Sequence, residues 1–383
     1  MDLLPDWAPN LHPLVLHFPI ALLFAAASFD LVGLLTRDRG SWRRTADWLY
    51  AVGALSAVAT WYTGTLAADS VFLPTEANAV LTEHADLGKF TMWFFAAYGL
   101  ARTGLAFTTL AARTGVRAIL FLLGVGGLFL MTITATHGAE LVYRHGVGVE
   151  AVESRPATPL VAPQSTDTGL SRSDAGWMWT PARAAAWIAE AEFVEGSAET
   201  LKSALVDGGE RGDVLELTAS GPTLFVFARQ IDRLQVDLAL DLSDFDGTVL
   251  VAHHVQEDGS YGFTSFGEGA VRLGKSENSD LLIQATESFD GSDWRDLRIV
   301  ADGTHFRSYV DTRMAIHGHG AALTPGAVGL RINGTGPVRL AVMQAIDLAA
   351  VGAAPEEAEP APAAQPAAEA PAPDSTAAGG HKH

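Results

Sequence analysis

The chain contains no cysteine among its 383 residues. Disulfides, thiolate metal sites and covalent attachment of c-type haem are therefore excluded. The chain is also short of basic residues, because 25 Lys and Arg stand against 44 Asp and Glu, for a net charge of −19. So acidic a chain is repelled by phosphate backbones, which argues against nucleic acid as a partner.

The acidity is distributed unevenly along the chain. Up to residue 150 there are 9 basic and 11 acidic residues, whereas the remaining residues contain 16 basic and 33 acidic ones. The length is sufficient for two domains with additional tails. The nearly neutral first part contains long apolar runs, so we expect a membrane part followed by an acidic domain.

Four apolar segments lie in the first part, and each has about the ~20 residues that a helix needs to cross a bilayer. They cover residues 14–35, 46–68, 87–112 and 116–142. The first is not typical of a signal peptide, because it lacks a basic leader and its apolar run is too long. We therefore predict a four-helix transmembrane bundle over residues 1–150, with the lipid bilayer as its partner.

The arginines indicate the orientation of these segments. The turns after the first and third segments contain Arg37, Arg39, Arg43, Arg44, Arg113 and Arg117. The opposite side has only Lys89 and Arg144. By the positive-inside rule the arginine-rich turns are cytoplasmic. We expect a bacterial inner-membrane protein whose N-terminus and C-terminal domain are periplasmic or extracellular.

The second part of the chain has three compositional zones. Residues 151–176 are rich in Pro, Ser and Thr and are typical of a linker. Residues 352–383 are rich in Ala and Pro, and we expect a disordered tail. Between them, residues 177–351 contain short alternating stretches such as "TLFVFAR", "LQVDLALDL" and "VRLAVMQAI", separated by turn residues. This pattern predicts an all-β sandwich of the jelly-roll kind.

Histidines gather at one side of the predicted bundle. His12, His17, His84, His137 and His145 all fall toward the outer ends of the four segments, and none lies in a cytoplasmic turn. At ~1.5 Å per helical residue, His12 and His17 differ in depth by only about 7.5 Å. The five side chains could therefore share one layer near the outer membrane interface.

Imidazoles from facing helices are the usual axial ligands of b-type haem. His17, His84 and His137 come from three different segments and are our candidate ligands of haem iron. His12 and His145 lie further out and are candidates for contact with a haem propionate, a second centre or solvent. The leading hypothesis is a membrane-anchored electron-transfer protein that binds haem b. Another metal or a proton-transfer role remains open for these histidines, and so do simple hydrogen bonds to helix ends and lipid headgroups.

Two pairs of charges accompany the histidines. Asp30 and Arg102 lie within the first and third apolar segments, where charged residues usually pair or line a pathway. Glu140 and Arg144 occupy helical positions next to His137, so they could orient that imidazole or bind a haem propionate.

The motifs "HPLVLHFPIALL", "HADLGKF" and "HGAELVYRHGVGV" resemble a bacterial four-helix membrane family catalogued as domain of unknown function 2231. The resemblance covers about residues 9–150, and His12, His17, His137 and His145 are the positions that match its motifs. It implies the same four-span architecture without an established reaction. Some relatives look fused to electron-transfer cytochrome modules, which implies a redox role.

The stretch from "WRDLRIVADGTHF" to "AVGLRINGTG" resembles the late strands of concanavalin-like and laminin-G-like sandwiches. This resemblance is one of strand pattern over about residues 185–349. It implies a jelly roll whose relatives bind glycans or proteins, so the outer domain could dock a glycan, a protein or a periplasmic redox partner. If the bundle serves only as an anchor, the protein is an envelope binding or structural protein.

The outer domain offers few candidate sites. No carboxylate pair suited to sugar hydrolysis is evident, so a hydrolase is not expected. Asp241, Asp244 and Asp246 in "DLSDFDGT" fall in an expected turn with some potential for calcium.

Two histidine pairs remain in the outer domain. His317 and His319 would share a face in a strand, but the adjacent glycines favour a loop, so a metal site there is the minor alternative to ordinary surface residues. His253 and His254 are consecutive in an expected strand, and alternation should point them to opposite faces.

Overall fold

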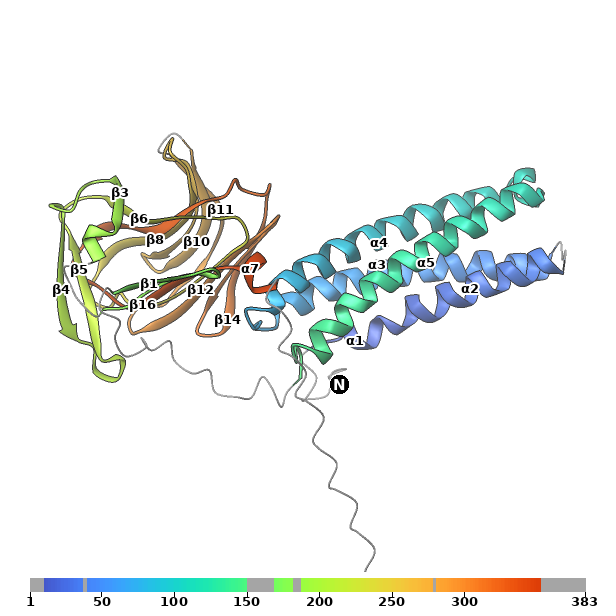
Figure 1. The fold of residues 1–383 in the computed structure, drawn as a ribbon. Helices are drawn as coiled ribbons and strands as arrows, with labels where there is room; N and C mark the ends of the chain where they lie inside the picture. Colours follow the sequence, from blue (N-terminus) through green and yellow to red (C-terminus); the bar gives the residue numbers. More distant parts are fainter. Residues whose placement is uncertain (1–9, 37–39, 150–168, 182–186, 278–279, 353–383) are drawn as a thin grey trace, which may run out of the picture. The chain divides into compact units, whose positions relative to one another are not determined.

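The computed structural model describes residues 10–36, 40–149, 169–181, 187–277 and 280–352. A helical region is followed along the chain by a β-sandwich (Figure 1). The predicted disordered tail lies outside the described residues from residue 353 onward, and most of the predicted linker lies outside them as well.

The helical region consists of long helices joined by short connections. The α-helices are α1 (His12–Val15), α2 (His17–Leu35), α3 (Ser41–Asp69), α4 (Ala77–Ala106) and α5 (Thr114–Tyr143), with a 3-10 turn at Thr109–Ala112. Two stretches, His12–Leu35 and Thr114–Tyr143, are long and apolar enough to cross a membrane. Helices α3 and α4 carry more charged residues, so the predicted count of four spans is not confirmed.

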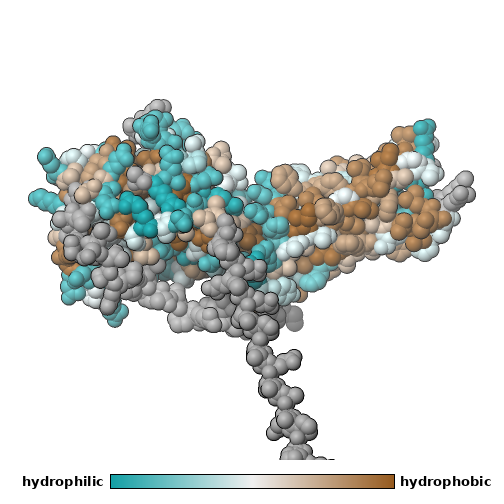
Figure 2. Space-filling view, in the orientation of Figure 1, coloured by the Kyte–Doolittle hydropathy of each residue, from teal (hydrophilic) through white to brown (hydrophobic). Residues whose placement is uncertain are grey.

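Small and aromatic residues form the centre of this bundle. Leu23 of α2, Tyr50 of α3 and Phe95 of α4 are fully buried, and Leu128 and Met131 of α5 complete the cluster. Figure 2 shows that large hydrophobic side chains also cover the outside of the helices. The bundle is therefore apolar both inside and outside, as membrane-type helices are.

Two antiparallel sheets make up the sandwich. One has the strand order β1-β2-β16-β7-β12-β13-β14, with β5 pairing to β16 and β4 to β5, and the other has the order β11-β10-β9-β8-β15-β6-β3. The strands of the first sheet are β1 (Leu170–Ser173), β2 (Gly176–Trp179), β4 (Leu201–Asp207), β5 (Asp213–Ala219), β7 (Leu234–Asp241), β12 (Arg295–Asp302), β13 (His305–Val310), β14 (Arg313–His319) and β16 (Val338–Asp347). Those of the second are β3 (Ala191–Glu195), β6 (Thr223–Ile231), β8 (Asp246–Val255), β9 (Tyr261–Gly267), β10 (Ala270–Glu277), β11 (Asp280–Ser288) and β15 (Gly326–Thr335).

The predicted sandwich is confirmed, and the stretches quoted from the sequence coincide with its strands. Their alternate residues, such as Val236, Leu238 and Leu330, fill the core between the sheets. The predicted domain boundary needs one correction, because β1 lies inside the segment 151–176 that we assigned to a linker. The Ser residues of β1 resemble linker composition, and its pairing with β2 is what makes it a strand.

Candidate metal centre

The end of α3, the start of α4 and the segment between them lie against the outer face of the first sheet. Phe72 packs edge-on against Tyr309 of β13, with 5.3 Å between ring centres. The guanidinium of Arg298 lies 4.7 Å from the centre of the Phe72 ring. Five side chains of β7, β12 and β13 form this outer face, and we call them the docking face: Gln235, Asp237, Arg298, Arg307 and Tyr309.

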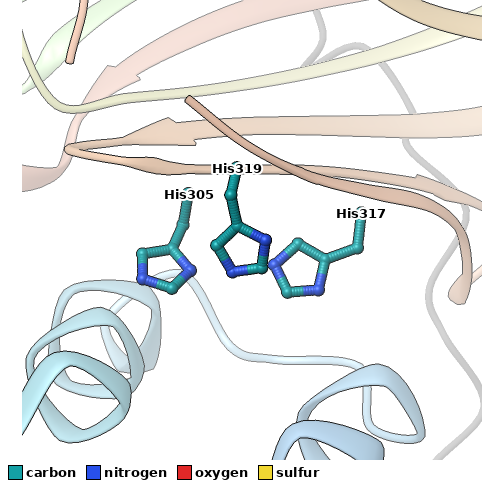
Figure 3. Close-up of side chains that lie close together, drawn as sticks. All are labelled: His305, His317 and His319. Carbon is teal, nitrogen blue, oxygen red and sulfur yellow. The ribbon is translucent and has the colours of Figure 1, made fainter. Parts of the chain in front are cut away.

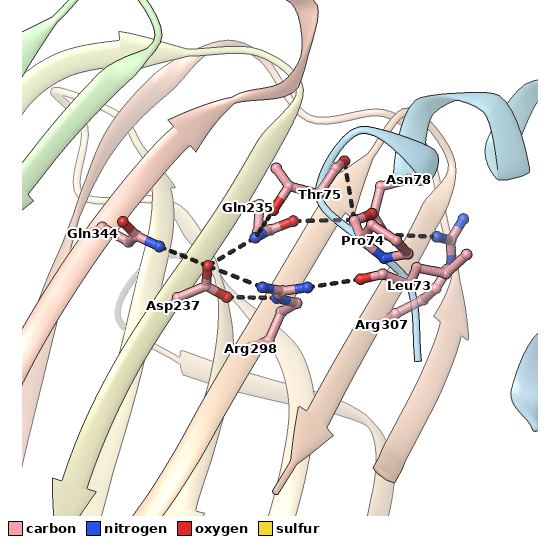
Figure 4. A network of polar contacts seen from close by, with 9 residues as sticks. All are labelled: Leu73, Pro74, Thr75, Asn78, Gln235, Asp237, Arg298, Arg307 and Gln344. Atoms are coloured by element: carbon pink, nitrogen blue, oxygen red, sulfur yellow. Dashed lines mark hydrogen bonds and ion pairs between the residues drawn. The ribbon is translucent and has the colours of Figure 1, made fainter. Parts of the chain in front are cut away.

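Hydrogen bonds tie the docking face to the helical region (Figure 4). Arg298 donates to the backbone carbonyl of Leu73 over 2.7 Å and is held by Asp237 at 2.6 Å. The amides of Asn78 and Gln235 are hydrogen-bonded to each other over 3.0 Å, and both side chains are fully buried. Buried polar groups with complete partners fix one arrangement of the two surfaces.

Arg307 is the most buried cation of the docking face, with 1% of its surface exposed. It donates to Thr82 over 2.8 Å and to Asn78 over 3.4 Å, and both acceptors are neutral. Its Nε atom has no hydrogen-bond partner among the described residues. The docking face therefore buries a positive charge, and this charge lies close to His305 and His317.

Three histidines, His305, His317 and His319, converge on one face of the sheet (Figure 3). Strands β13 and β14 form a hairpin in which His305 is paired with His319 and Arg307 with His317. The turn at Asp311 and Thr312 has positive φ at both residues, as a type I′ hairpin turn requires. The expectation of a loop at His317 and His319 is therefore wrong, because pairing with β13 holds both residues in strand β14.

The three imidazoles are close enough to share one ion. Ring centres lie 4.5 Å apart for His317 and His319, 4.8 Å for His305 and His319, and 6.0 Å for His305 and His317. One nitrogen of each ring lies within 4.8 Å of the others. We call His305, His317 and His319 the histidine triad; the sequence alone did not connect His305 to the other two.

Two carboxylates reach the triad from the helices. Asp69, the last residue of α3, lies 2.7 Å from Nδ1 of His317, and Asp86 of α4 lies 3.4 Å from Nε2 of His305. The second ring nitrogen of His317, Nε2, is buried and has no hydrogen-bond partner among the described residues. A buried nitrogen without a partner is costly unless a ligand binds it.

The surroundings of His305 and His319 favour the neutral form of both rings. Burial, together with the Arg307 cation, lowers the pKa of His305 to about 4. Burial, with His317 as a further cause, lowers the pKa of His319. Neutral imidazole is the form that binds metal ions.

Two histidines of the bundle are held in matching ways. Nδ1 of His12 lies 3.1 Å from the carbonyl oxygen of Thr60, and Nδ1 of His84 lies 2.9 Å from that of Thr134. In each case the ring packs on the glycine four residues after the threonine, Gly64 for His12 and Gly138 for His84. The two rings meet edge to face with 6.5 Å between their centres.

The other histidines of the predicted layer are placed differently. Nδ1 of His137 donates to the carbonyl of Ile133 over 2.9 Å, and its Nε2 lies 3.4 Å from a carboxylate oxygen of Glu83. His17 is exposed on α2, and His145 is half-buried beyond the end of α5. The structure therefore brings His12 and His84 together and does not bring His17 into contact with them.

The haem prediction requires a slot for a flat macrocycle of several hundred Å³, the size of an ordinary ligand cavity. Two hollows among the described residues, one in the sandwich and one beside Arg102, each have a cavity volume of about 10 Å³, and neither is lined by a bundle histidine. The rings of His12 and His84 contact each other edge to face instead. The residues as they stand do not fit haem, so haem binding gains no support from this geometry and stays a prediction.

The charges inside the bundle form a closed cluster. Arg102 contacts Asp30 at 2.5 Å and Asp47 at 2.7 Å, and it also donates to the hydroxyl of Tyr98 over 2.8 Å. Arg102 and Asp30 are both buried. These partners accept the hydrogen bonds of Arg102 inside the bundle. The contacts therefore favour a structural ion pair of Asp30 with Arg102 over a role in a pathway.

Glu140 and Arg144 form an ion pair of 3.1 Å on the surface of α5 and its C-terminal end. Arg144 is more than half exposed. The ion pair joins the two side chains to each other at the end of α5.

Our expectation that His253 and His254 cannot pair is wrong. The Nδ1 atoms of the two rings lie 2.9 Å apart, and Nε2 of His254 donates to the carbonyl of Asp232 over 2.9 Å. The pairing of β8 with β15 shifts register here, and His254 has φ of +54°. This bulge breaks the alternation on which the expectation depended.

The aspartates proposed for calcium have another partner. Arg339 contacts Asp241 at 3.0 Å and Asp244 at 2.8 Å, and it also contacts Glu216 at 3.1 Å. The guanidinium already lies among these carboxylates as their cation, so Asp241 and Asp244 do not fit a calcium ion in this arrangement.

Residues 8–151 match the model of a family described as "Predicted membrane protein (DUF2231)". The match covers less than half of the chain. It agrees with the resemblance seen in the sequence and with the apolar helices of this region. No curated protein matches the chain.

Solved structures resemble the sandwich at low identity. They include a carbohydrate-binding module from Bacillus subtilis, with 16% identity, 37% of this chain and 91% of that chain covered, and a TM-score of 0.31. A Bacillus licheniformis β-glucanase has 11% identity, 48% and 94% coverage and a TM-score of 0.34. A Bacillus subtilis protein of unknown function with a galectin-like fold has 9% identity, 46% and 98% coverage and a TM-score of 0.35. The likeness concerns the sandwich fold, and nothing about ligands follows from it.

Proposed function

We propose that this protein is a membrane-anchored metal-binding protein whose sandwich holds one divalent transition-metal ion, such as Zn²⁺, in the histidine triad. The observation that carries the proposal is the convergence of three imidazole nitrogens within 4.8 Å of one another. Two of the histidines come from one strand and the third from its hairpin partner, so the backbone itself holds them together.

The spacing of the rings suits one tetrahedral ion. With a metal–nitrogen distance of about 2.0 Å, each ring centre lies about 3 Å from the ion, and tetrahedral ligands then have ring centres about 5 Å apart. The triad has spacings of 4.5, 4.8 and 6.0 Å. Small side-chain rotations would therefore complete the ligand geometry.

The donor atoms favour a particular class of metal. Imidazole nitrogens suit zinc, copper, nickel and iron, whereas calcium and magnesium prefer shells of oxygen atoms. The chain has no cysteine that could supply thiolates. The low pKa values of His305 and His319 support the proposal, because these ligands need not lose a proton before they bind.

The helices supply the membrane anchor of this proposal. Large apolar side chains on their outside, such as Leu35, Leu100, Phe107 and Phe129, are 70–87% exposed. Lipid is the solvent in which such a surface is stable. With the arginine-rich turns in the cytoplasm, the sandwich and its metal site would lie on the outer side of a bacterial inner membrane.

Metal titration tests the proposal directly. The full chain, purified in mild detergent and stripped with a chelator, should bind one equivalent of Zn²⁺ in a calorimetric titration. His317→Ala and His319→Ala should each weaken binding at least tenfold. His17→Ala is the matched control, because His17 is an exposed histidine of α2 and belongs to neither strand of the triad. Zinc binding that survives both triad changes would reject the site.

Haem-dependent electron transfer is the second candidate. It is supported by the gathering of His12, His84 and His137 from three different helices, and it requires their rings to separate and admit a macrocycle. A reducible Soret band in the protein purified from haem-sufficient cells would support it, and His84→Ala should then abolish the band. A colourless preparation would count against this function without affecting the metal site. A periplasmic redox partner is a proposal that depends on this candidate alone.

A glycan or protein ligand for the rest of the sandwich is likewise a proposal. It is supported by the sandwich architecture and not by a located site. Screening the purified full chain against a glycan array would test it, and His317→Ala should leave such binding unchanged if the metal site is separate.

A further inference from the structure

Two side chains of the bundle face the histidine triad, although the triad belongs to the sandwich. We propose that Asp69 and Asp86 are positioning residues for the bound metal ion, so that metal binding and docking of the sandwich onto the bundle strengthen each other. This inference rests on the proposed function, because it assumes that the triad binds metal.

Asp69 determines which nitrogen of His317 is available. Its carboxylate lies 2.7 Å from Nδ1, so that nitrogen carries the proton and donates it to Asp69. Nε2 is then the lone-pair nitrogen, and it is the atom that is buried without a partner among the described residues. A carboxylate, a histidine and a metal in this order form the arrangement that orients ligands in many metal sites.

Asp86 stands in the same relation to His305. Its carboxylate lies 3.4 Å from Nε2, which leaves Nδ1 as the atom available for a metal ion. Asp86 and Asp69 come from α4 and α3, so both helices that contact the docking face take part. Each carboxylate also offsets the positive charge that Arg307 and a metal ion would place together.

The coupling follows from these contacts. The carboxylates can orient the triad only while the helices are docked, so the docked form must bind metal more tightly than an undocked form. By linkage, metal must then favour the docked form by the same factor. Losing the partner that orients a metal-binding histidine typically costs ~10–100-fold in metal affinity.

Metal affinity of the full chain is the first test. Asp69→Ala and Asp86→Ala should each weaken Zn²⁺ binding by ~10–100-fold. Asp69→Asn should recover part of the affinity, because an amide oxygen still accepts the hydrogen bond from Nδ1 of His317. Glu76→Ala is the matched control, since Glu76 is an exposed acidic residue at the start of α4 and should leave the affinity unchanged.

Docking is the second test, and the absence of cysteine makes it simple. Spin labels on Tyr143→Cys and Glu199→Cys, both at exposed positions, would report the distance between bundle and sandwich by pulsed electron resonance. Zn²⁺ should narrow the distance distribution of the wild-type background. It should not do so when His317→Ala or the two aspartate changes are added.

The outcomes separate the two proposals. If the wild type binds zinc and the aspartate variants bind it equally well, the inference is overturned and the proposed function stands. If affinity falls but zinc leaves the distance distribution unchanged, the coupling to docking is overturned. If the wild type binds no zinc, both proposals fall together.

Discussion

Both the bundle and the sandwich contain clustered histidines, but the ring nitrogens have different partners in the two regions. In the bundle, His12 and His84 each use Nδ1 on a backbone carbonyl of a neighbouring helix and rest on a glycine. In the sandwich, one nitrogen of each triad ring lies within 4.8 Å of the others, and Nε2 of His317 is buried without a hydrogen-bond partner among the residues that the structure describes.

This difference shows that closeness of histidines is not enough to indicate a site. Rings that are satisfied by the backbone contribute to packing, whereas nitrogens that converge without partners are prepared for a ligand. The same contrast holds for arginines, because Arg102 in the bundle has two carboxylate partners and Arg307 on the docking face has neutral acceptors.

The largest expected effect concerns the bundle's ion cluster. Replacing Arg102 by Met should destabilise the protein by about 3–5 kcal/mol, because Asp30 and Asp47 would remain inside the bundle without their cation. Thermal unfolding of the full chain in detergent would measure the loss. A change below 1 kcal/mol would show that the cluster is not the structural centre that its contacts indicate.

The next largest loss of stability is expected when a glycine that packs against a bundle histidine is replaced by alanine. A Cβ on residue 138 would lie 2.9 Å from Cε1 of His84, so Gly138→Ala should displace the ring from Thr134 and cost about 1–3 kcal/mol. Gly126→Ala in the same helix is the control, because a Cβ there meets nothing within 4 Å and should be neutral or stabilising by about 0.5–1 kcal/mol. Equal stabilities for the two variants would remove the packing role of the bundle histidines.

A pH effect should come from the sandwich. Burial lowers the pKa of His253 and of His254, so the folded state takes up protons at these rings less readily than the unfolded state, in which they titrate near pH 6.5. Their contribution is complete above pH 6.5 and is lost as the pH falls below it, by up to about 1.4 kcal/mol per pH unit for each group. Denaturant unfolding between pH 7.5 and 5 would measure the slope, and His253→Leu should flatten it; an unchanged slope would contradict the assignment.

The smallest effect is expected at the surface of the bundle. Arg144→Ala removes an exposed ion pair with Glu140 and should change stability by no more than about 0.5 kcal/mol. The same variant should leave zinc affinity unchanged. A large loss in either measurement would mean that this pair contacts more than its exposed position indicates.

Local patterns in the sequence predicted much of the fold. Apolar runs gave the helices, and alternating stretches such as residues 234–242 gave strands of the sandwich. The pairing of Asp30 with Arg102 could also be predicted from the sequence, because charged residues in apolar segments need partners. These features depend on neighbours in sequence or on the general cost of burying charge.

The triad and the docking face depend on information that local patterns do not contain. Glycines beside His317 and His319 favoured a loop. Even a regular hairpin centred on Asp311 and Thr312 would have aligned His305 with Gly318, because the observed pairing with His319 depends on a register shift between Ser308 and Tyr309. The contact of Asn78 with Gln235 joins residues 157 positions apart, and no periodicity reports such a pairing. Likewise, the bulge at His254 is a local departure from alternation that the sequence does not mark.

X-ray absorption at the zinc edge of the metal-loaded full chain would probe the triad most directly. We predict an ion bound by three imidazoles, with zinc–nitrogen distances of about 2.0–2.1 Å and the outer-shell scattering that imidazole rings produce. Zinc surrounded only by water and carboxylate oxygens, or zinc that washes out of the wild-type protein, would contradict the metal centre.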